Sequence, residues 1–363
     1  MTDYPFTIFS FIGVLLCIPP AYFNWKIPSR PWATLILIGW ILVLNLLFFI
    51  DSIVWSSEDT STWWDGHVYC DINSRIKDAF TIGVPGAAIG ICRFLADATN
   101  PDPSQKDLHH TRLRRNLIDF FLGIILPCIG LALKYICEPS RYRINGVNGC
   151  TGTIAFTWPS LLVFILWCPV LCLVAAGYAG LYLALILLIL VLFLRHWWVR
   201  RKRMNENWNI GVRNGISRND FRRLFFTVIC VLFVYLPLSL YGLQVFLLNP
   251  FGPYPKNTIH GKFWNVILFV ERPVAIWSSW VGIALAITSF VLIGFTRNAK
   301  KSYEHCVEWL YDHAPKKLQG KLGGWKKTSD LCKERRAGSM STFHGPRNNI
   351  SMVEGYHLRY YHD

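Results

Sequence analysis

Seven long apolar stretches divide this chain of 363 residues, and they constrain its fold more than any other feature. A helix rises about 1.5 Å per residue, so about 20 apolar residues match the hydrocarbon thickness of a bilayer. A helix satisfies its own backbone polar groups inside lipid, so each stretch reads as one membrane-crossing helix. The sequence therefore predicts an all-α membrane protein, a seven-transmembrane helix bundle. The predicted spans are residues 5–23, 32–55, 70–98, 117–136, 158–194, 224–248 and 273–295.

The composition agrees with a membrane protein and argues against a nucleic-acid-binding one. Hydrophobic residues make up 53% of the chain and charged residues 16%, whereas a soluble domain carries roughly 25% charged residues. The formal net charge of +15 comes from basic residues that cluster next to the span ends. Basic residues in that position orient a protein in the membrane and contact anionic lipid. We therefore expect membrane lipids, and not nucleic acid, as partners of this charge.

The distribution of Lys and Arg over the loops predicts the orientation. The loops at 24–31, 99–116 and 195–223 hold 2, 4 and 9 basic residues, and the chain from residue 296 holds 13. The opposite loops, 56–69, 137–157 and 249–272, hold 0, 2 and 3. Because basic residues accumulate at the cytoplasmic ends of spans, the first set lies inside. The N-terminus is then extracellular and the C-terminus cytoplasmic.

The fifth stretch, 158–194, is long enough for two short spans that turn near Gly177 and Gly180. A split would place the loop at 195–223, with its nine basic residues, on the outer side. That placement violates the charge rule, so we expect a single long fifth helix that extends into the cytoplasm.

Ionisable side chains open the third span. Asp71, Arg75 and Asp78 fall within one arc of about 60° on a helix, whereas Lys77 lies on another side and is expected to extend outward. Charged groups in a span usually face the bundle interior or a water-filled cavity. The arc is either the polar wall of an outward-facing pocket or an ion-paired cluster, with an Asp71–Arg75 pair, that fixes helix packing.

The next outer-side candidates are acidic and aromatic. Asp51 lies near the outer end of span two, and Trp63 and Trp64 follow in an acidic loop. Tryptophans at a membrane interface are commonly anchors, but with acids beside them they would also suit a ligand with apolar and cationic parts. The sequence leaves both interpretations open.

Two features concern the inner half of the bundle. Arg93, near the inner end of span three, is either a contact for a cytoplasmic partner or an ordinary anchor at the span end. Pro237 removes a backbone hydrogen bond in the middle of span six, so it is either a hinge or a static kink.

The chain after span seven divides into two segments. Apolar residues at helical spacing within 297–315 predict a short amphipathic helix on the inner membrane surface. Residues 316–363 are basic and polar, and we expect them to be a disordered cytoplasmic tail. The membrane domain is accordingly predicted as 1–296.

Several chemistries lack their motifs. The eleven cysteines include no Cys-x-x-Cys pair, and the ten histidines lie in loops, in the tail or just past a span end, so we predict no metal site, no cofactor and no enzyme activity. Cys70, Cys137 and Cys150 flank spans on the outer side, which leaves one disulfide and one free thiol if that side is oxidising. A small-solute transporter or channel remains the alternative function.

The chain resembles the fungal receptor family for lipopeptide mating pheromones over roughly residues 5–305. The two most specific matches are the opening of span three and a Gly-Cys pair in the second outer loop. The motifs are Tyr69-Cys70-Asp71-Ile72-Asn73-Ser74-Arg75-Ile76, Ile91-x-Arg93-x-Leu95, Leu126-Pro127, Gly149-Cys150 before Trp158, Leu236-Pro237-Leu238-Ser239-Leu240-Tyr241, and Phe290…Gly294-Phe295 followed by Ala299-x-x-x-Tyr303.

The resemblance implies a G-protein-coupled receptor of the plasma membrane. Its ligand would be a secreted peptide that ends in a farnesylated, methyl-esterified cysteine, and its partner a heterotrimeric G protein. In this reading Cys70 and Cys150 form the disulfide, Arg93, Arg200, Arg201, Lys202 and Arg203 contact the G protein, and helix six swings about Pro237. The expected ligand contacts are Asp51, Trp63, Trp64, Asp71, Arg75, Asp78 and Trp158.

Overall fold

The structure, a computed structural model, describes most of the predicted membrane domain. The chain divides into two compact units, Met1–Ala299 and Lys300–Asp363, and the second lies outside the described residues. The described residues are 4–25, 31–57, 59–99, 108–179, 218–252, 254, 259–261, 264–271, 275 and 277–294.

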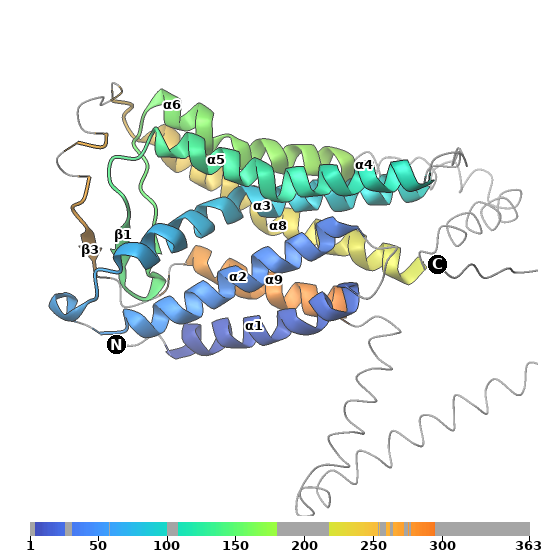
Figure 1. The fold of residues 1–363 in the computed structure, drawn as a ribbon, viewed down its shortest axis with the longest axis horizontal. Helices are drawn as coiled ribbons and strands as arrows, with labels where there is room; N and C mark the ends of the chain where they lie inside the picture. Colours follow the sequence, from blue (N-terminus) through green and yellow to red (C-terminus); the bar gives the residue numbers. More distant parts are fainter. Residues whose placement is uncertain are drawn as a thin grey trace, which may run out of the picture. The chain divides into compact units, whose positions relative to one another are not determined.

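Six helices in these ranges are long and apolar enough to cross a membrane, and a shorter apolar helix, Trp280–Gly294, follows them. Together they confirm the predicted seven-helix bundle, in which the helices run side by side (Figure 1). In chain order the spans are α1 (Tyr4–Trp25); α2 (Trp32–Val54); α3 (His67–Thr99); α4 (Leu108–Phe120), η2 (Phe121–Ile125) and α5 (Leu126–Tyr135); α6 (Trp158–Ser160), η4 (Leu161–Ile165) and residues 167–179; α8 (Arg218–Leu248); and η5 (Trp277–Ser279), α9 (Trp280–Ser289) and η6 (Phe290–Gly294).

Helix α3 is the central helix of the bundle. In its most apolar 18-residue window 83% of the residues are buried, against 28% for α1 and for the sixth span. It packs against α2, α5, η2 and α8. Gly86 makes one of these contacts possible, because a Cβ at this position would overlap the backbone carbonyl of Leu122. A helix enclosed in this way has little surface left for lipid.

The fourth span contains a π-helical turn, η2, which ends two residues before Pro127. Proline has no N–H, so the carbonyl of Gly123, four residues earlier, loses its helical donor. The indole Nε1 of Trp40 on α2 donates to that carbonyl at 2.9 Å and replaces the missing bond. The irregular turn thereby ties the fourth span to α2.

A three-stranded sheet covers one end of the bundle, next to the start of α3 (Figure 1). Strands β1 (Arg143–Asn145) and β2 (Cys150–Thr151) are antiparallel, and β3 (Leu268–Val270) pairs in parallel with the other side of β1. The sheet joins the second and third loops of this end, and the all-α prediction did not include it. We call this end, which also carries the disulfide described below, the disulfide end.

Some predictions concern residues outside those that the structure describes. The fifth span is helical up to Ala179, and its predicted extension to residue 194 lies outside the described residues. The predicted amphipathic helix at 297–315, the tail at 316–363 and the basic cluster Arg200–Arg203 also lie outside them.

Candidate functional site

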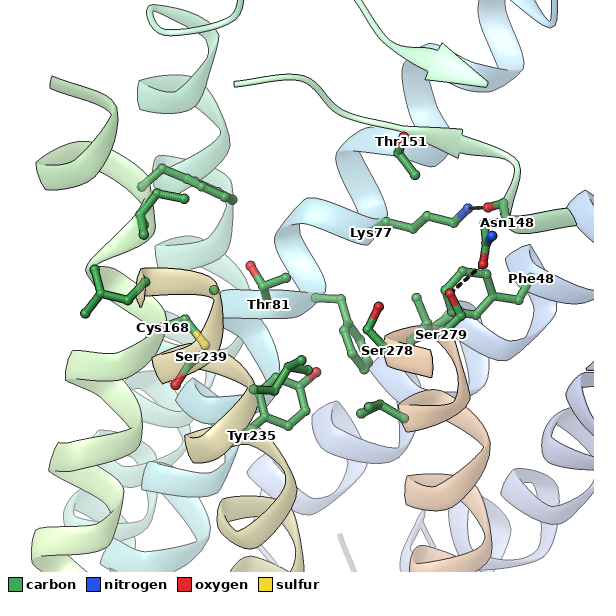
Figure 2. Close-up of a pocket in the computed structure, with 18 residues that line it drawn as sticks. Phe48, Lys77, Thr81, Asn148, Thr151, Cys168, Tyr235, Ser239, Ser278 and Ser279 are labelled. Carbon is green, nitrogen blue, oxygen red and sulfur yellow. Dashed lines mark hydrogen bonds between the residues drawn. The ribbon is translucent and has the colours of Figure 1, made fainter. Parts of the chain in front are cut away.

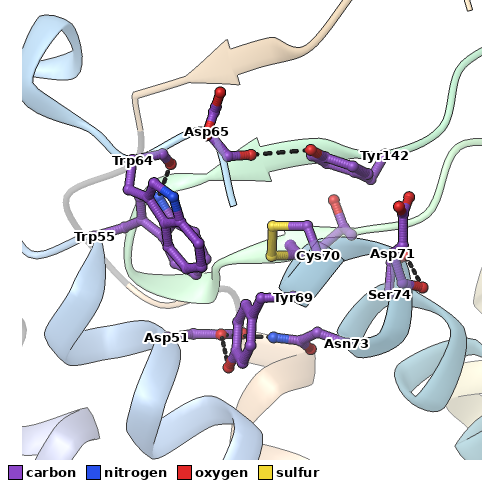
Figure 3. Close-up of a disulfide and its surroundings, with 12 residues drawn as sticks. Asp51, Trp55, Trp64, Asp65, Tyr69, Cys70, Asp71, Asn73, Ser74 and Tyr142 are labelled. Atoms are coloured by element: carbon purple, nitrogen blue, oxygen red, sulfur yellow. Dashed lines mark hydrogen bonds between the residues drawn. A yellow bond between two sulfur atoms is a disulfide. The ribbon is translucent and has the colours of Figure 1, made fainter. Parts of the chain in front are cut away.

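A disulfide between Cys70 and Cys150 joins the start of α3 to strand β2, with the two Cα atoms 5.2 Å apart. Both cysteines are buried in a small cluster with Trp55, Tyr142 and Ile144 (Figure 3). The pairing that the resemblance implied is therefore confirmed, and Cys137 is the free thiol. The bond fixes the loop at 137–157 to the central helix.

Gly149, next to this disulfide, brings the loop into contact with α2. Its φ of 65° and ψ of −146° fall in a region that is essentially restricted to glycine. A Cβ at this position would also overlap the carboxyl group of Asp51. The Gly-Cys pair thus has a physical reason: glycine permits the turn, and cysteine anchors it.

Lys77 and Asp51 form an ion pair between α3 and α2, with 10% and 0% of their side chains exposed. Tyr69 and Asn73 also donate to the Asp51 carboxylate, at 2.8 and 2.6 Å. The expectation that Lys77 extends outward is wrong, because α3 is enclosed on that side as well. The buried carboxylate draws the ammonium group inward and compensates its charge.

The same ammonium group binds the loop at 137–157. Lys77 Nζ donates to the backbone carbonyl oxygens of Asn148 and Cys150, at 2.8 and 3.1 Å. One lysine therefore joins α3, α2 and the loop segment around the disulfide.

Asp71 forms a further link to this loop. Arg141 pairs with the Asp71 carboxylate through two nitrogens, and its Nε lies 3.1 Å from Asp71 Oδ1. The hydrogen bond from Arg141 to Asp71 raises the pKa of the Arg141 guanidinium. About a third of each side chain is exposed, so solvent screens this pair.

Arg75 and Asp78 are also paired, although not with Asp71. Arg75 pairs with Glu138, and Asp78 pairs with Lys134, whose Nζ lies 3.4 Å from Glu138 Oε1. Burial raises the pKa of Glu138, while the charges of Lys134 and Arg75 oppose the rise. These contacts favour the packing interpretation of the charged arc, with partners supplied by residues 134–141 in place of an Asp71–Arg75 pair.

A cavity of about 370 Å³ lies beneath this part of the loop, between helices α2, α3, α8, the fifth span and the start of the seventh (Figure 2). Lys77, Asn148 and Thr151 form its upper wall, and Tyr235 lies deeper on α8. Ser279 Oγ lies 2.7 Å from Asn148 Oδ1, which ties the seventh span to the loop. The lining residues are Leu44, Phe48, Lys77, Phe80, Thr81, Asn148, Thr151, Phe164, Ile165, Cys168, Tyr235, Leu238, Ser239, Gly242, Leu243, Ser278, Ser279 and Val281.

The predicted ligand contacts lie around the disulfide end and are not among these lining residues. Trp63 donates from Nε1 to the Ser57 carbonyl at 2.9 Å and packs edge-on against Phe269 of β3. Trp64 is 53% exposed and stacks on Trp55. Asp51, Asp71, Arg75 and Asp78 are held in the ion pairs described above.

Trp158, the last predicted contact, begins the fifth span. It is 60% exposed and stacks on Phe251, with ring centroids 4.6 Å apart. Among the described residues, the predicted contacts therefore form an outer layer, separate from the cavity lining.

One residue of the cavity lining stands out in the sequence, the ionisable Lys77 inside an apolar helix, but its position on the helical wheel predicts that it extends outward. Tyr235, Ser278 and Ser279 gave no comparable signal, since tyrosine and serine are common in membrane helices. Their grouping depends on how α8 and the seventh span pack against α3.

At the opposite end of the bundle, Arg93 is half-buried, and one of its terminal nitrogens is buried without a hydrogen-bond partner among the described residues. The buried Asp119 carboxylate on α4 acts on it electrostatically. Helix α8 continues through Pro237 without a break.

Comparisons with known proteins agree with one another. A family model described as pheromone A receptor matches residues 5–312. Over 329 residues the chain is 26% identical to the pheromone a factor receptor of Saccharomyces cerevisiae, a match that covers 90% of this chain and 65% of the relative. Over 160 residues it is 29% identical to the pheromone M-factor receptor of Schizosaccharomyces pombe, with 44% and 42% covered.

A third relative is pheromone receptor 2 of Mycosarcoma maydis, 28% identical over 250 residues, with 65% of this chain and 67% of the relative covered. The chain spans less than two-thirds of the length of the first two relatives. No solved structure matches the chain. The three relatives are pheromone receptors by name, and none of them is a transporter or a channel.

Proposed function

We propose, because the chain belongs to the pheromone A receptor family, that it is a cell-surface receptor for a peptide pheromone that signals through a heterotrimeric G protein. The observation that carries this proposal is the family match over residues 5–312, which includes all seven predicted spans. The cavity beneath the second outer loop supports it, because it offers a ligand site at one end of the bundle.

We propose a farnesylated peptide as the ligand, with its lipid group in the cavity. The volume of about 370 Å³ lies in the usual range of ligand pockets, roughly 300–1,000 Å³. Lys77 is the one lining residue with a charged side chain in the described part of the chain, and Asp51 compensates it. Such a wall favours an uncharged, apolar group. The apolar lining residues are Leu44, Phe48, Phe80, Phe164, Ile165, Leu238, Leu243 and Val281.

The peptide part of the ligand would then contact the outer layer at the disulfide end. Trp64 and Trp158 are exposed enough to make such contacts directly. Asp71 and Arg75 already pair with charges of the loop, and Asp78 pairs with Lys134 of α5, so a ligand that contacts them has to exchange those partners. Asp51 would influence ligand binding indirectly, because it positions Lys77. Trp63 would influence it through its packing on β3.

We propose that the disulfide end is extracellular, with the N-terminus outside the cell and the C-terminus in the cytoplasm. The Lys and Arg counts of the loops support this orientation, as does a disulfide at the end that would face an oxidising compartment. The protein then crosses the plasma membrane seven times.

On the cytoplasmic side we propose Arg93 and the Arg200–Arg203 cluster as G-protein contacts. Pro237 would be the point about which the inner half of α8 moves. A ligand drives such a change only if it binds one of the two states more tightly. Normal signalling after Arg93→Ala would remove Arg93 from this role.

The test is expression in a fungal cell that lacks its own receptor and carries a pheromone-responsive reporter. Candidate farnesylated peptides are added, and each is compared with the same peptide without the farnesyl group. We expect one farnesylated peptide to activate the reporter and its unmodified counterpart to be inactive. Equal responses to both would refute the lipid assignment, and surface-expressed protein that responds to no peptide would refute the receptor proposal.

A further inference from the structure

The hydroxyl group of Tyr235 is unusual among the polar groups around the cavity. Tyr235 lies on α8, two residues before Pro237, and only 3% of the residue is exposed. Its hydroxyl is buried and has no hydrogen-bond partner among the residues that the structure describes. A buried hydroxyl left unpaired destabilises a folded protein, so this group has to be explained.

Three other hydroxyl groups along the cavity, those of Thr81, Ser239 and Ser279, already donate hydrogen bonds. Thr81 Oγ1 donates to the Asp78 carbonyl at 2.7 Å, and Ser239 Oγ donates to the Leu236 carbonyl at 2.9 Å. Ser279 is bonded to Asn148, and the donors of Lys77 are taken by Asp51 and the loop carbonyls. Tyr235 therefore differs from these neighbours in having an unused donor.

The surroundings of Tyr235 limit which partner can reach it. Its ring packs against Phe80 of α3, with centroids 5.9 Å apart, and it forms part of the cavity wall. Figure 2 shows its oxygen on the side of the ring that faces the segment with Ser278. The cavity beside the ring has room for a molecule, so a ligand that fills the cavity would lie against Tyr235.

We propose that the Tyr235 hydroxyl recognises the ligand by donating a hydrogen bond to a carbonyl oxygen, such as that of an ester or amide, carried on an otherwise apolar group. This inference rests on the proposed function, because it takes the cavity as the pheromone site. It assigns Tyr235 as a specificity-determining residue. The site then selects an apolar chain joined to a carbonyl over a plain hydrocarbon of the same size.

The position of Tyr235 also gives the contact a consequence. The hydroxyl is carried by α8 close to Pro237, where the helix lacks one backbone hydrogen bond. A bond formed only in the ligand-bound state stabilises the position of α8 in that state and in no other. Tyr235 would thus both recognise the carbonyl of the ligand and stabilise one position of α8.

The first experiment measures stability without ligand. Tyr235→Phe removes only the hydroxyl, and an unpaired buried hydroxyl contributes no stability. We therefore expect the purified variant in detergent to melt at the wild-type temperature or higher. Tyr178→Phe, which removes the hydroxyl of a residue that is 42% exposed and lies outside the cavity lining, is the matched control and should behave as wild type. A lower melting temperature for Tyr235→Phe, or failure of that variant to accumulate, would overturn the inference, because the hydroxyl would then have a structural partner.

The second experiment measures binding of a defined probe, N-acetyl-S-farnesylcysteine methyl ester, to the same purified proteins. We expect Tyr235→Phe to bind it roughly 5- to 30-fold more weakly than wild type, the effect of one buried hydrogen bond, and Tyr178→Phe to bind it equally well. Equal affinity of wild type and Tyr235→Phe would overturn the role of Tyr235 and leave the proposed function standing. Failure of wild type itself to bind the probe would overturn the cavity as the lipid site, and this inference with it.

Discussion

Loss of either partner of the ion pair between Lys77 and Asp51 is expected to destabilise the disulfide end strongly. The Lys77→Met variant keeps the length of the side chain but leaves the Asp51 carboxylate, which is fully buried, without its cation. Removal of one partner of a buried pair costs about 3–5 kcal/mol. Tyr69 and Asn73 still donate to the carboxylate and moderate this cost, whereas the carbonyls of Asn148 and Cys150 lose a donor.

We therefore expect Lys77→Met to lower the free energy of unfolding by about 4 kcal/mol, and Asp51→Asn by about 3 kcal/mol, because each leaves one buried charge unpaired. The double variant carries neither charge and should lose only about 1–2 kcal/mol. The two effects are thus strongly non-additive, as expected for residues in direct contact.

Equilibrium unfolding in mixed detergent micelles measures these differences, and Arg143→Met serves as the control. Arg143 lies on β1 and is exposed, so its loss should cost less than about 0.5 kcal/mol. The reasoning is refuted if the double variant loses the sum of the single losses, or if Lys77→Met costs no more than the Arg143 control.

Three further predictions concern the loop that Lys77 holds. Cys150→Ala removes a link between residues 80 positions apart, so we expect a loss of about 4–5 kcal/mol and little surface protein, measured by labelling intact cells; normal surface levels would contradict this. Gly149→Ala places a Cβ in a glycine-only conformation and in overlap with Asp51. Overpacking alone costs about 1–3 kcal/mol, so we expect denaturant unfolding to show a loss of stability of this size or larger. A neutral effect would contradict the turn geometry. Burial raises the pKa of Tyr142 to about 12, above its ordinary value near 10, so the folded state keeps this proton up to a higher pH than the unfolded state does. The free energy of unfolding therefore falls as the pH rises from 10 to 12, and Tyr142→Phe should make this fall less steep. An equally steep fall in Tyr142→Phe would contradict the burial of the hydroxyl.

The sequence predicted the bundle well because membrane spans are determined by local composition. Each predicted span that lies in the described ranges contains an apolar helix, with ends shifted by a few residues. Helix α3, for example, begins at His67, three residues before the predicted start of its span. The sheet was not predicted, because its strands have only two or three residues and because β3 belongs to a loop that is distant in sequence from the loop of β1 and β2.

The candidate site was predicted less well, and Lys77 illustrates the reason. A helical wheel separates Lys77 from the arc of Asp71, Arg75 and Asp78. This separation predicts that the arc faces the bundle interior and that Lys77 faces away from it. That interpretation assumes that one face of the helix meets lipid. Because α3 is enclosed by its neighbours, both faces are interior, and each charge pairs with a separate partner on α2, on α5 or on the loop at 137–157.

The charged arc shows a related limit. Arg141, Glu138 and Lys134 pair with α3 across 56 to 70 positions in the sequence, and nothing in the local pattern of α3 identifies them as partners. The motif Gly149-Cys150 was recognised by resemblance, and its physical role became clear only from the contact of Gly149 with Asp51.

The most direct test of the central claim is nucleotide exchange on a purified heterotrimeric G protein that is incubated with this protein in lipid vesicles. We predict that a farnesylated peptide that activates the cellular reporter also accelerates exchange, and that the same peptide without farnesyl does not. No acceleration by any such peptide, or a solute flux through the vesicles that the peptide opens, would contradict the assignment as a pheromone receptor.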